Sequence, residues 1–289
     1  MSALPQIHPA KVHQRKSLRL LDTTRIPIGR ALIDVCSFQQ AHEAVLAHAT
    51  TGSESACILT PNAQHVVLLD QDRHLREIYD SAALVVPDGA SLVMAAHLLG
   101  LSLKERVPGV DLFESLCAGA AAASLKVFFL GGRPGSADLA ASLLRCRYPG
   151  LTVETYCPPL GFERDVAELS RMDAMIRRFE PNIVFVGLGA PKQEYWMYDH
   201  GRKLGPSVLI GVGGSFELVT GIVRRAPRWL QAIGFEWLHR LCMEPRRLWR
   251  RYLIGNLQFL QIVLRQRLSK QSPLVLSAFI VFICGHFSF

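Results

Sequence analysis

The sequence lacks the features that would assign a chain of 289 residues to several common classes of protein. Its seven cysteines are scattered, odd in number and without a C-x-x-C pair. This pattern argues against a disulfide frame or a zinc site and fits reduced thiols in the cytosol. The N-terminus is polar and has no apolar segment of the signal-peptide kind, so secretion is not expected. No complete G-x-G-x-x-G and no G-x-x-x-x-G-K-S/T occurs, so the usual dinucleotide and P-loop signatures are missing.

Acidic residues are scarce near the C-terminus. The formal net charge is +8, and the stretch from Arg224 to Lys270 holds eleven Lys or Arg but only two acids, Glu236 and Glu244. Such an excess predicts a phosphate-rich partner: nucleic acid, anionic lipid or a polyprenyl diphosphate. Residues 224–267 also show helical periodicity, with arginines on one side and tryptophans and leucines on the other. The segment is either a membrane-facing or partner-facing module, or a helix pair on the core with its arginines in solvent.

Short apolar runs followed by turns and helix-forming sequence are abundant, and two of them, Ile183–Val186 and Val208–Ile210, are β-branched and lead into glycine turns. They predict strands at Ala56–Leu59, Ala83–Val86, Lys126–Gly131, Leu151–Thr155, Ile183–Gly187 and Val208–Val212. The intervening segments predict helices at Asn62–Tyr79, Gly89–Leu99, Val110–Ala123, Ser136–Arg147, Ala167–Phe179 and Lys192–Leu204. This alternation predicts an α/β fold, a Rossmann-like open and mostly parallel sheet sandwiched by helices, which is followed by a helical C-terminal appendage.

The chain divides into four expected parts. Residues 1–24 are expected to be a poorly ordered arm. A small β unit, turned at Gly29, begins after it at Arg25. Residues 25–221 form the α/β core, 222–270 the basic amphipathic helical appendage and 271–289 a hydrophobic tail. A membrane-spanning helix needs roughly 20 apolar residues. The apolar run from Pro273 to Phe289 is therefore borderline.

Glycine turns follow three of the predicted strands. These turns are Gly131-Gly132, Gly187-Leu188-Gly189 and Gly213-Gly214. Tight strand-to-helix connections are their plainest explanation. Because they would meet at one end of the sheet, their N–H groups are also candidates for binding phosphate or uracil.

Polar residues follow two other predicted strands. Thr60 and Asn62 come after the first, and Asp88 comes after the second, with Arg106 downstream. Helix capping explains Thr60 and Asn62 equally well. Asp88, at a strand end beside glycine turns, is a better candidate for a general base. Arg106 by itself is more readily explained as an ordinary surface charge.

Several motifs then combine into a family resemblance. They are TPNAQHVVLL, VVPDGASLV, ERVPGVDLFESL, FFLGGRPGSA, YPGL, IVFVGLGAPKQEYWM, IGVGGSFELVTGIVRRAPRWLQAIGFEWLHRL and EPRRLWRRYLIGN. Together, over roughly Arg25 to Gln261, they resemble the WecG/TagA/CpsF family of bacterial glycosyltransferases. The resemblance implies inverting transfer from a UDP-sugar to a polyprenyl-diphosphate-linked saccharide. It also implies a role in cell-surface or exopolysaccharide synthesis, at the cytoplasmic face of the plasma membrane, as a peripheral or tail-anchored protein.

The resemblance assigns roles to residues that match the family motifs. Asp88 would be the base, and Thr60, Asn62 and Gln193 would line the donor pocket. Arg106 matches the arginine before the family's PG-x-D segment, and either it or an appendage arginine would stabilise the departing UDP. From their place at the strand ends, and not from the resemblance, the glycine turns at Gly131, Gly132, Gly213 and Gly214 are also predicted to bind the donor. Three appendage arginines would close over the site and grip the lipid diphosphate: Arg240, Arg247 and Arg250.

Neither a metal nor a cofactor is expected. Asp70 and Asp72 form a D-x-D of the kind that holds a metal in many glycosyltransferases. The pair lies in the middle of a predicted helix, where residues two apart point to different faces. We therefore expect surface charge there, with no metal site.

Two other classes of protein are alternatives to the glycosyltransferase interpretation. A nucleotide-dependent oxidoreductase is disfavoured by the missing fingerprint. A non-enzymatic basic nucleic-acid-binding module is disfavoured because the basic segment leads into an apolar tail, so no nucleic acid partner is expected. The expected partners are the UDP-sugar, the lipid-linked acceptor and the cytoplasmic membrane surface. The donor sugar (N-acetylmannosamine, its uronic acid or glucose) and the oligomeric state, including a homo-oligomer, stay open.

Overall fold

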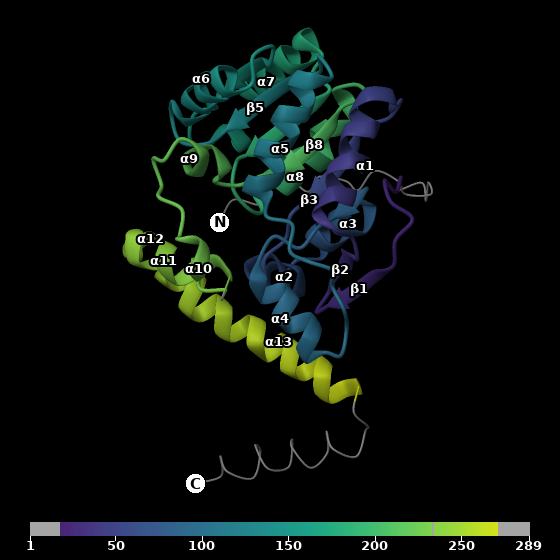
Figure 1. Ribbon diagram of the computed structural model, residues 1–289, viewed down its shortest axis with the longest axis vertical. Coiled ribbons are helices and arrows are strands. Elements are labelled where there is room, and N and C mark those ends of the chain that lie inside the picture. The colour runs from purple at the N-terminus through teal and green to yellow at the C-terminus, as the bar shows by residue number, and fades with distance from the viewer. Residues whose placement is uncertain (1–17, 233, 271–289) are drawn as a thin grey trace, which may run out of the picture.

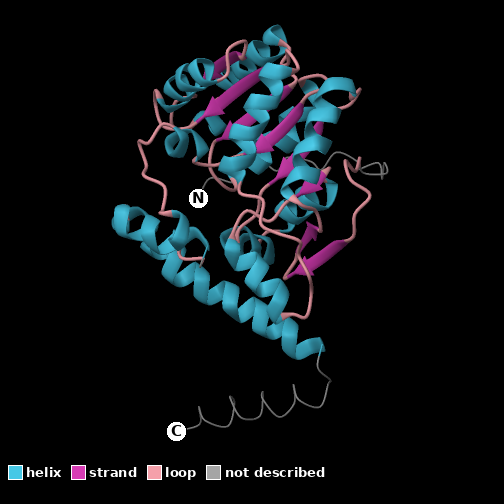
Figure 2. Ribbon diagram, viewed as in Figure 1, coloured by secondary structure: helices cyan, strands magenta, loops and turns pink. Residues whose placement is uncertain are grey.

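A six-stranded parallel sheet forms the centre of the molecule (Figures 1 and 2). The computed structural model describes residues 18–232 and 234–270. The strand order is β4-β3-β8-β7-β5-β6. The bounds are β3 (Ala56–Leu59), β4 (Leu84–Val85), β5 (Lys126–Gly131), β6 (Thr152–Tyr156), β7 (Ile183–Gly187) and β8 (Val208–Gly211). The predicted α/β fold with a parallel sheet is confirmed.

The order of the strands explains where a ligand can bind. From β4 the chain crosses over β3, β8 and β7 to begin β5, and it later returns to place β7 and β8 in the middle. All neighbouring strands are parallel, so the turns after β3, β4, β5, β7 and β8 meet at one edge. Ligands of open parallel sheets bind at this edge.

Helices cover both faces of the sheet because the strands are apolar on both sides. One face packs against α1 (Phe38–Thr51), α5 (Gly109–Ala122), α6 (Ser136–Arg147) and α9 (Ser215–Val219). The other packs against α2 (Ala63–Gln71), α3 (Arg73–Ser81), α7 (Val166–Phe179) and α8 (Lys192–His200). Short 3₁₀ turns at Phe162–Arg164 and Gly201–Lys203 flank α7 and α8. The first face contains a cluster of phenylalanines, in which Phe113 contacts Phe185 edge to face with ring centroids 4.8 Å apart.

The predicted β unit at the N-terminus is confirmed as a hairpin. Strands β1 (Arg25–Ile28) and β2 (Ala31–Asp34) pair antiparallel around Gly29, whose φ of +59° suits glycine. The hairpin ends at Asp34, a fully buried carboxylate that is paired with Arg19 at 2.6 Å and Arg25 at 3.1 Å. Residues 18–24 of the expected arm thus lie against the core, and residues 1–17 lie outside the described residues.

The single helix expected over Asn62–Tyr79 is instead two helices, α2 and α3. Asp72 separates them, because its side chain accepts the backbone N–H of Leu75 at 3.0 Å and so caps α3. Its other oxygen accepts a hydrogen bond from the hydroxyl of Tyr195. The mid-helix position expected for the D-x-D pair is therefore wrong for Asp72, which serves as a cap.

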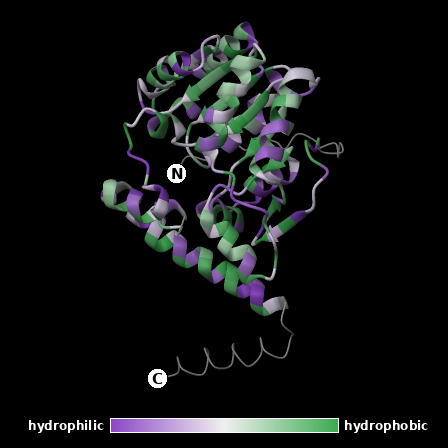
Figure 3. Cartoon of the chain, viewed as in Figure 1, coloured by the Kyte–Doolittle hydropathy of each residue, from purple (hydrophilic) through white to green (hydrophobic). Residues whose placement is uncertain are grey.

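The segment after the sheet is helical, as predicted. It comprises α10 (Arg228–Ala232), α11 (Glu236–Met243), α12 (Pro245–Trp249), a π-helical turn at Arg250–Ile254, and α13 (Gly255–Lys270). Helix α13 crosses α2 and α4 (Ala90–Leu98), and it buries Phe259 and Val263 in the same apolar cluster as the core (Figure 1). Hydrophobic and hydrophilic residues alternate along it (Figure 3). The appendage is therefore joined to the core through a shared interior.

Within residues 18–232 and 234–270, no helix is both long and apolar enough to cross a membrane. The hydrophobic tail predicted for residues 271–289 lies outside the described residues.

Candidate active site

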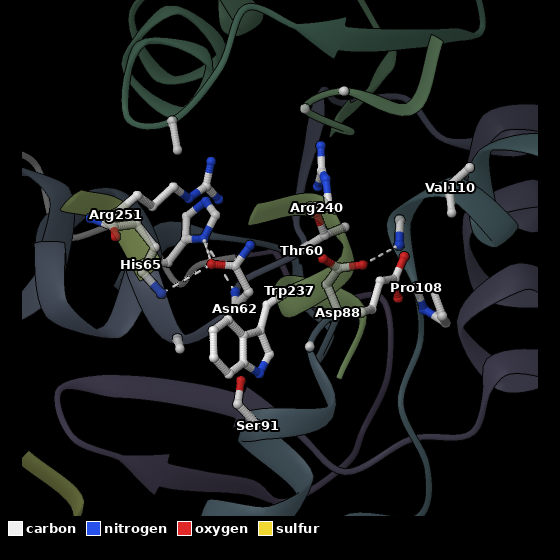
Figure 4. Close-up of a pocket in the computed structure, with 18 of the residues that line it drawn as sticks. Thr60, Asn62, His65, Asp88, Ser91, Pro108, Val110, Trp237, Arg240 and Arg251 are labelled. Carbon is white, nitrogen blue, oxygen red and sulfur yellow. Dashed lines mark hydrogen bonds between the residues drawn. The ribbon is translucent and has the colours of Figure 1, made fainter. Parts of the chain in front are cut away.

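A cavity of about 630 Å³ lies at the carboxyl edge of the sheet. One wall consists of the turns that follow β3, β4, β5, β7 and β8. The facing wall comes from the C-terminal helices, through Glu236, Trp237 and Arg240 of α11, the π-helical turn and α13. Figure 4 shows Trp237 and Arg240 pointing into the cavity together with Thr60, Asn62 and Asp88. The appendage thus completes the site that the sheet begins.

Asp88 lies between β4 and α4 and is half-buried in this cavity. Its Oδ1 accepts the backbone N–H of Gly109 at 2.7 Å (Figure 4). No described residue hydrogen-bonds Oδ2, so this oxygen is left for a ligand. Burial raises the pKa of Asp88 from its ordinary value of 3.8, and the nearby charge of Glu236 raises it further. The Gly109 hydrogen bond, His65 and Arg106 lower it by less. A carboxylate with a raised pKa is better suited to accept a proton than an ordinary surface Asp.

Thr60 and Asn62 line the cavity, but both also support the fold. The hydroxyl of Thr60 donates to the carbonyl of Gly211 at 2.7 Å and so ties the turn after β3 to the end of β8. Asn62 is the N-cap of α2, and its Oδ1 accepts the backbone N–H of Gln64 at 3.0 Å. The capping explanation is confirmed for Asn62. Its side chain nonetheless belongs to the cavity lining.

Gln193 is held by a buried polar network that the sequence analysis missed. Its Nε2 donates to buried Glu194 at 2.8 Å, and its Oε1 accepts the backbone N–H of Gly213 at 3.2 Å. The same oxygen of Glu194 lies 3.3 Å from Nε2 of His65, whose Nδ1 accepts the backbone N–H of Asn62 at 3.2 Å. Two residues expected in the donor pocket are therefore linked through His65 and Glu194. Only the adjacency of Glu194 to Gln193 hinted at this in the sequence.

Arg106 contacts the appendage. Its guanidinium lies 3.2 Å from the carboxylate of Glu236 and 3.3 Å from the amide oxygen of Gln231. Arg225 reinforces the same junction through two hydrogen bonds to Asp111, and its Nε lies 3.9 Å from Glu236. Arg106 is therefore at the site, and its charge is partly balanced by the appendage.

The glycine turns divide into two groups. Gly132, Gly213 and Gly214 line the cavity, and Gly132 and Gly213 have φ values of +82° and +52° that favour glycine. Gly131, which was expected to line it as well, does not. A Cβ at Gly131 would approach the backbone of Gly187 to 2.9 Å, so this glycine allows two strands to end close together.

Glu217, in α9, is a second buried carboxylate at the cavity. Its Oε1 accepts the backbone N–H of Arg133 at 2.6 Å and the hydroxyl of Ser136 at 3.2 Å. Its Oε2 is buried and has no hydrogen-bond partner among the described residues. An unpaired carboxylate oxygen in such a position is an acceptor for ligand hydroxyl groups.

The three appendage arginines differ in position. Arg240 reaches across from α11: its Nη2 would lie 3.4 Å from a Cβ at Gly214, and its Nε is buried without a partner in the described part of the chain. Arg250 is exposed, does not line the cavity, and places its guanidinium over the ring of Trp249. Arg247 lies in α12, and its side chain is outside the described residues. Arg251, which the sequence analysis did not single out, lines the cavity.

Among the described residues, no three His, Cys, Asp or Glu side chains are grouped so as to hold a metal ion. Asp70 and Asp72 do not line the cavity.

Comparison with known proteins identifies a family model and several similar sequences. The sequence profile described as "Glycosyl transferase WecG/TagA/CpsF family" matches residues 26–273. Three similar proteins are each named N-acetylglucosaminyldiphosphoundecaprenol N-acetyl-beta-D-mannosaminyltransferase. The protein of Staphylococcus aureus (strain MW2) is 31% identical over 202 residues, covering 70% of this chain and 78% of the relative. The protein of Bacillus subtilis (strain 168) is 31% identical over 198 residues, covering 68% of this chain and 75% of the relative. The protein of Bacillus spizizenii is 32% identical over 201 residues, covering 70% of this chain and 76% of the relative.

Proposed function

This chain belongs to the WecG/TagA/CpsF family of glycosyltransferases, and we propose that its cavity moves a sugar, with inversion, from a UDP-sugar to a polyprenyl-diphosphate-linked saccharide. Family membership confirms the resemblance seen in the sequence and identifies the protein as a glycosyltransferase. The oxidoreductase and nucleic-acid alternatives are set aside accordingly.

One observation carries the proposal. A half-buried carboxylate with a raised pKa, Asp88, shares a single cavity with the glycine turn that ends at Gly214 and with the guanidinium of Arg240. Inverting transfer needs one group that removes a proton and others that stabilise a departing diphosphate. Both kinds of group are present in this cavity.

The proposed reaction assigns a role to each of these groups. Oδ2 of Asp88 takes the proton of the acceptor hydroxyl as its oxygen bonds to the anomeric carbon. The bond from that carbon to the UDP oxygen breaks at the same time, and UDP leaves with the bonding electrons. The backbone N–H of Gly214 and the guanidinium of Arg240 stabilise the negative charge on the departing diphosphate.

The remaining polar residues fit the donor. Asn62 and Gln193 are positioned by the His65–Glu194 network to meet the nucleotide, and the unpaired Oε2 of Glu217 can accept a ribose or sugar hydroxyl. Arg106, balanced by Glu236, lies where the core and the appendage meet, and we assign it to the acceptor side of the cavity.

We propose that the protein works as a peripheral protein at the cytoplasmic face of the plasma membrane, in cell-surface or exopolysaccharide synthesis. Support comes from the basic charge of the C-terminal helices and from their exposed apolar residues, such as Trp229, Leu253 and Leu257. The names of the relatives include a lipid-linked acceptor, which is consistent with this location.

The test is a panel of UDP-sugars incubated with a short-chain lipid-diphosphate N-acetylglucosamine acceptor, with UDP release and glycosylated product measured together. The names of the relatives make UDP-N-acetylmannosamine the first donor to try. We expect product with one donor and inverted anomeric configuration by NMR. Retained configuration, or no transfer from any UDP-sugar to this acceptor, would contradict the proposal.

A further inference from the structure

The cavity has a polar end and an apolar end. The polar end is the strand-end half that holds Asp88 and Arg240. The other half, which we call the α4–α13 arm, lies between those two helices and is lined by Met94, Ala95, Leu98, Phe259, Leu260 and Val263. No described charged side chain lines the arm between these six residues. The polar site therefore continues directly into an apolar channel.

The polarity changes in the same direction along both helices. Helix α4 starts next to Asp88, and its lining face proceeds from Ser91 to Met94 and Leu98. On α13 the lining face proceeds from Asn256 to Leu260. At 1.5 Å per residue, the lining face of α4 extends about 12 Å away from Asp88. A ligand that follows this path meets charged groups first and hydrocarbon afterwards.

The apolar end opens to the surface. Side chains at its mouth are unusually exposed for their type, with Met94 at 58%, Leu98 at 47% and Leu260 at 46%. Leu257 and Leu264 of α13 lie on the same helix outside the cavity and are exposed too. Contiguous apolar surface of this kind indicates a binding site for an apolar ligand or a membrane.

We propose that the α4–α13 arm binds the first isoprene units of the lipid-linked acceptor while its diphosphate and sugar lie at the Asp88 end. The inference rests on the proposed function for the identity of the acceptor. An amphiphile with a charged head and a branched hydrocarbon chain matches the order of polar and apolar lining, and a chain leaving the mouth would pass directly into a bilayer. The arm would make the enzyme selective for the lipid carrier as well as for the sugar.

Two matched variants of α13 test this assignment. Leu260 and Leu264 are leucines with the same exposure of 46%, but only Leu260 lines the cavity. Leu260→Gln and Leu264→Gln therefore remove the same apolar group from the outer surface and differ in their effect on the arm. Binding of farnesyl diphosphate and of inorganic diphosphate to the full-length protein is measured by calorimetry, without detergent and below the aggregation limit of the lipid.

We expect wild-type protein to prefer farnesyl diphosphate to inorganic diphosphate. Leu260→Gln should weaken farnesyl diphosphate binding about tenfold, the scale of one lost large apolar contact, and leave inorganic diphosphate unchanged. Leu264→Gln should bind both as wild type does. A Met94→Gln variant should behave as Leu260→Gln does, which shows that both helices form the arm and guards against a folding defect in either single variant.

Equal effects of Leu260→Gln and Leu264→Gln, or no preference for the isoprenyl chain in wild type, would overturn the assignment. The apolar run from Pro273 to Phe289 could occupy the arm in place of the lipid. The same binding measurement on a chain that ends after Lys270 tests this second occupant. If that shortened chain alone gains isoprenyl binding, the arm holds the protein's own C-terminus and the proposal is wrong. Farnesyl binding with the predicted variant pattern but no sugar transfer would leave the arm in place and contradict the proposed function instead.

Discussion

The chemistry of Asp88 depends on its surroundings more than on its residue type. Its Oδ1 is fixed by Gly109, and burial raises its pKa while Oδ2 stays available. We expect Asp88→Asn to lower kcat by about 10² to 10⁴, the usual loss for a general base, with little change in donor affinity. Initial rates at saturating donor and acceptor, with donor binding by calorimetry, measure both quantities. A folded variant with wild-type turnover would remove Asp88 from the mechanism.

The raised pKa of Asp88 also predicts the pH dependence. A base acts in its deprotonated form, so kcat should fall as pH drops through the pKa of Asp88, at a pH above its ordinary value of 3.8. The negative charge of Glu236 raises that pKa, while Arg106, which Glu236 partly balances, lowers it. Glu236→Gln should therefore move the acid limb of the kcat profile to lower pH. A limb that stays in place, or moves to higher pH, would show that another group controls it.

Arg240 is expected to act on the departing UDP. Its guanidinium lies against Gly214, and its Nε is buried without a partner among the described residues. Arg240→Ala should lower kcat by roughly 10²-fold, as loss of a group that stabilises developing charge does. The control is Arg246→Ala, which removes the same charge from an exposed position outside the cavity. Equal losses in the two variants would mean that only overall charge matters.

The residues of the site were predictable to different degrees. Asp88 and the cavity glycines follow strands, so their place at the carboxyl edge can be read from the sequence. The network of His65 with Glu194, and the contact of Arg106 with Glu236, join residues more than a hundred positions apart. Local pattern contains no information on such pairs, which arise only when the sheet and the appendage have packed.

At the scale of elements, the strands were the most predictable because each is a short apolar run between turns. Strands β3, β5 and β7 match their predicted bounds. The division between α2 and α3 was missed because an Asp inside an apolar periodic pattern looks like a surface charge. Only the capping contacts of Asp72 with Leu75 and Tyr195 show that it ends one helix and begins another.

The hairpin β1–β2 buries Ile28 and Ile33 in the core cluster and is also tied to the sheet by one buried carboxylate. Asp34 pairs with Arg19 and Arg25 and accepts the backbone N–H of Val85 in β4 at 2.8 Å. Replacing it by Asn leaves two arginines without their counter-charge, so Asp34→Asn should lower the free energy of unfolding by about 3 kcal/mol. Urea denaturation followed by circular dichroism measures this.

A control for that experiment lies in the same region of the chain. Asp70 is 3.9 Å from Arg30, and both side chains are exposed. Asp70→Asn should therefore change the free energy of unfolding by no more than about 1 kcal/mol. If the two substitutions cost the same, the burial of Asp34 contributes nothing to attaching the hairpin.

At the scale of the whole molecule, the C-terminal helices cannot be regarded as a detachable anchor. Helix α13 buries Phe259 and Val263 in the core cluster, and Gln266 donates to the carbonyl of Pro27 at 2.8 Å and accepts the backbone N–H of Gly29 at 2.7 Å. Removal of everything after Gly221 would expose this interior and remove a wall of the cavity. Membrane binding is better tested by a cut that leaves α13 in place.

The last prediction concerns how the protein binds to a membrane. Arginines near an anionic leaflet contribute about 1 kcal/mol each, and salt screens them, whereas buried apolar surface is insensitive to salt. The chain carries both, as basic residues before Lys270 and an apolar run after it. Full-length protein should stay on anionic vesicles at high salt, and a chain ended after Lys270 should bind at low salt and be released by salt. Flotation of both forms with phosphatidylglycerol vesicles measures this. Equal retention at high salt would mean that the exposed leucines of α13 suffice for binding, so that the arginines and the apolar run add little.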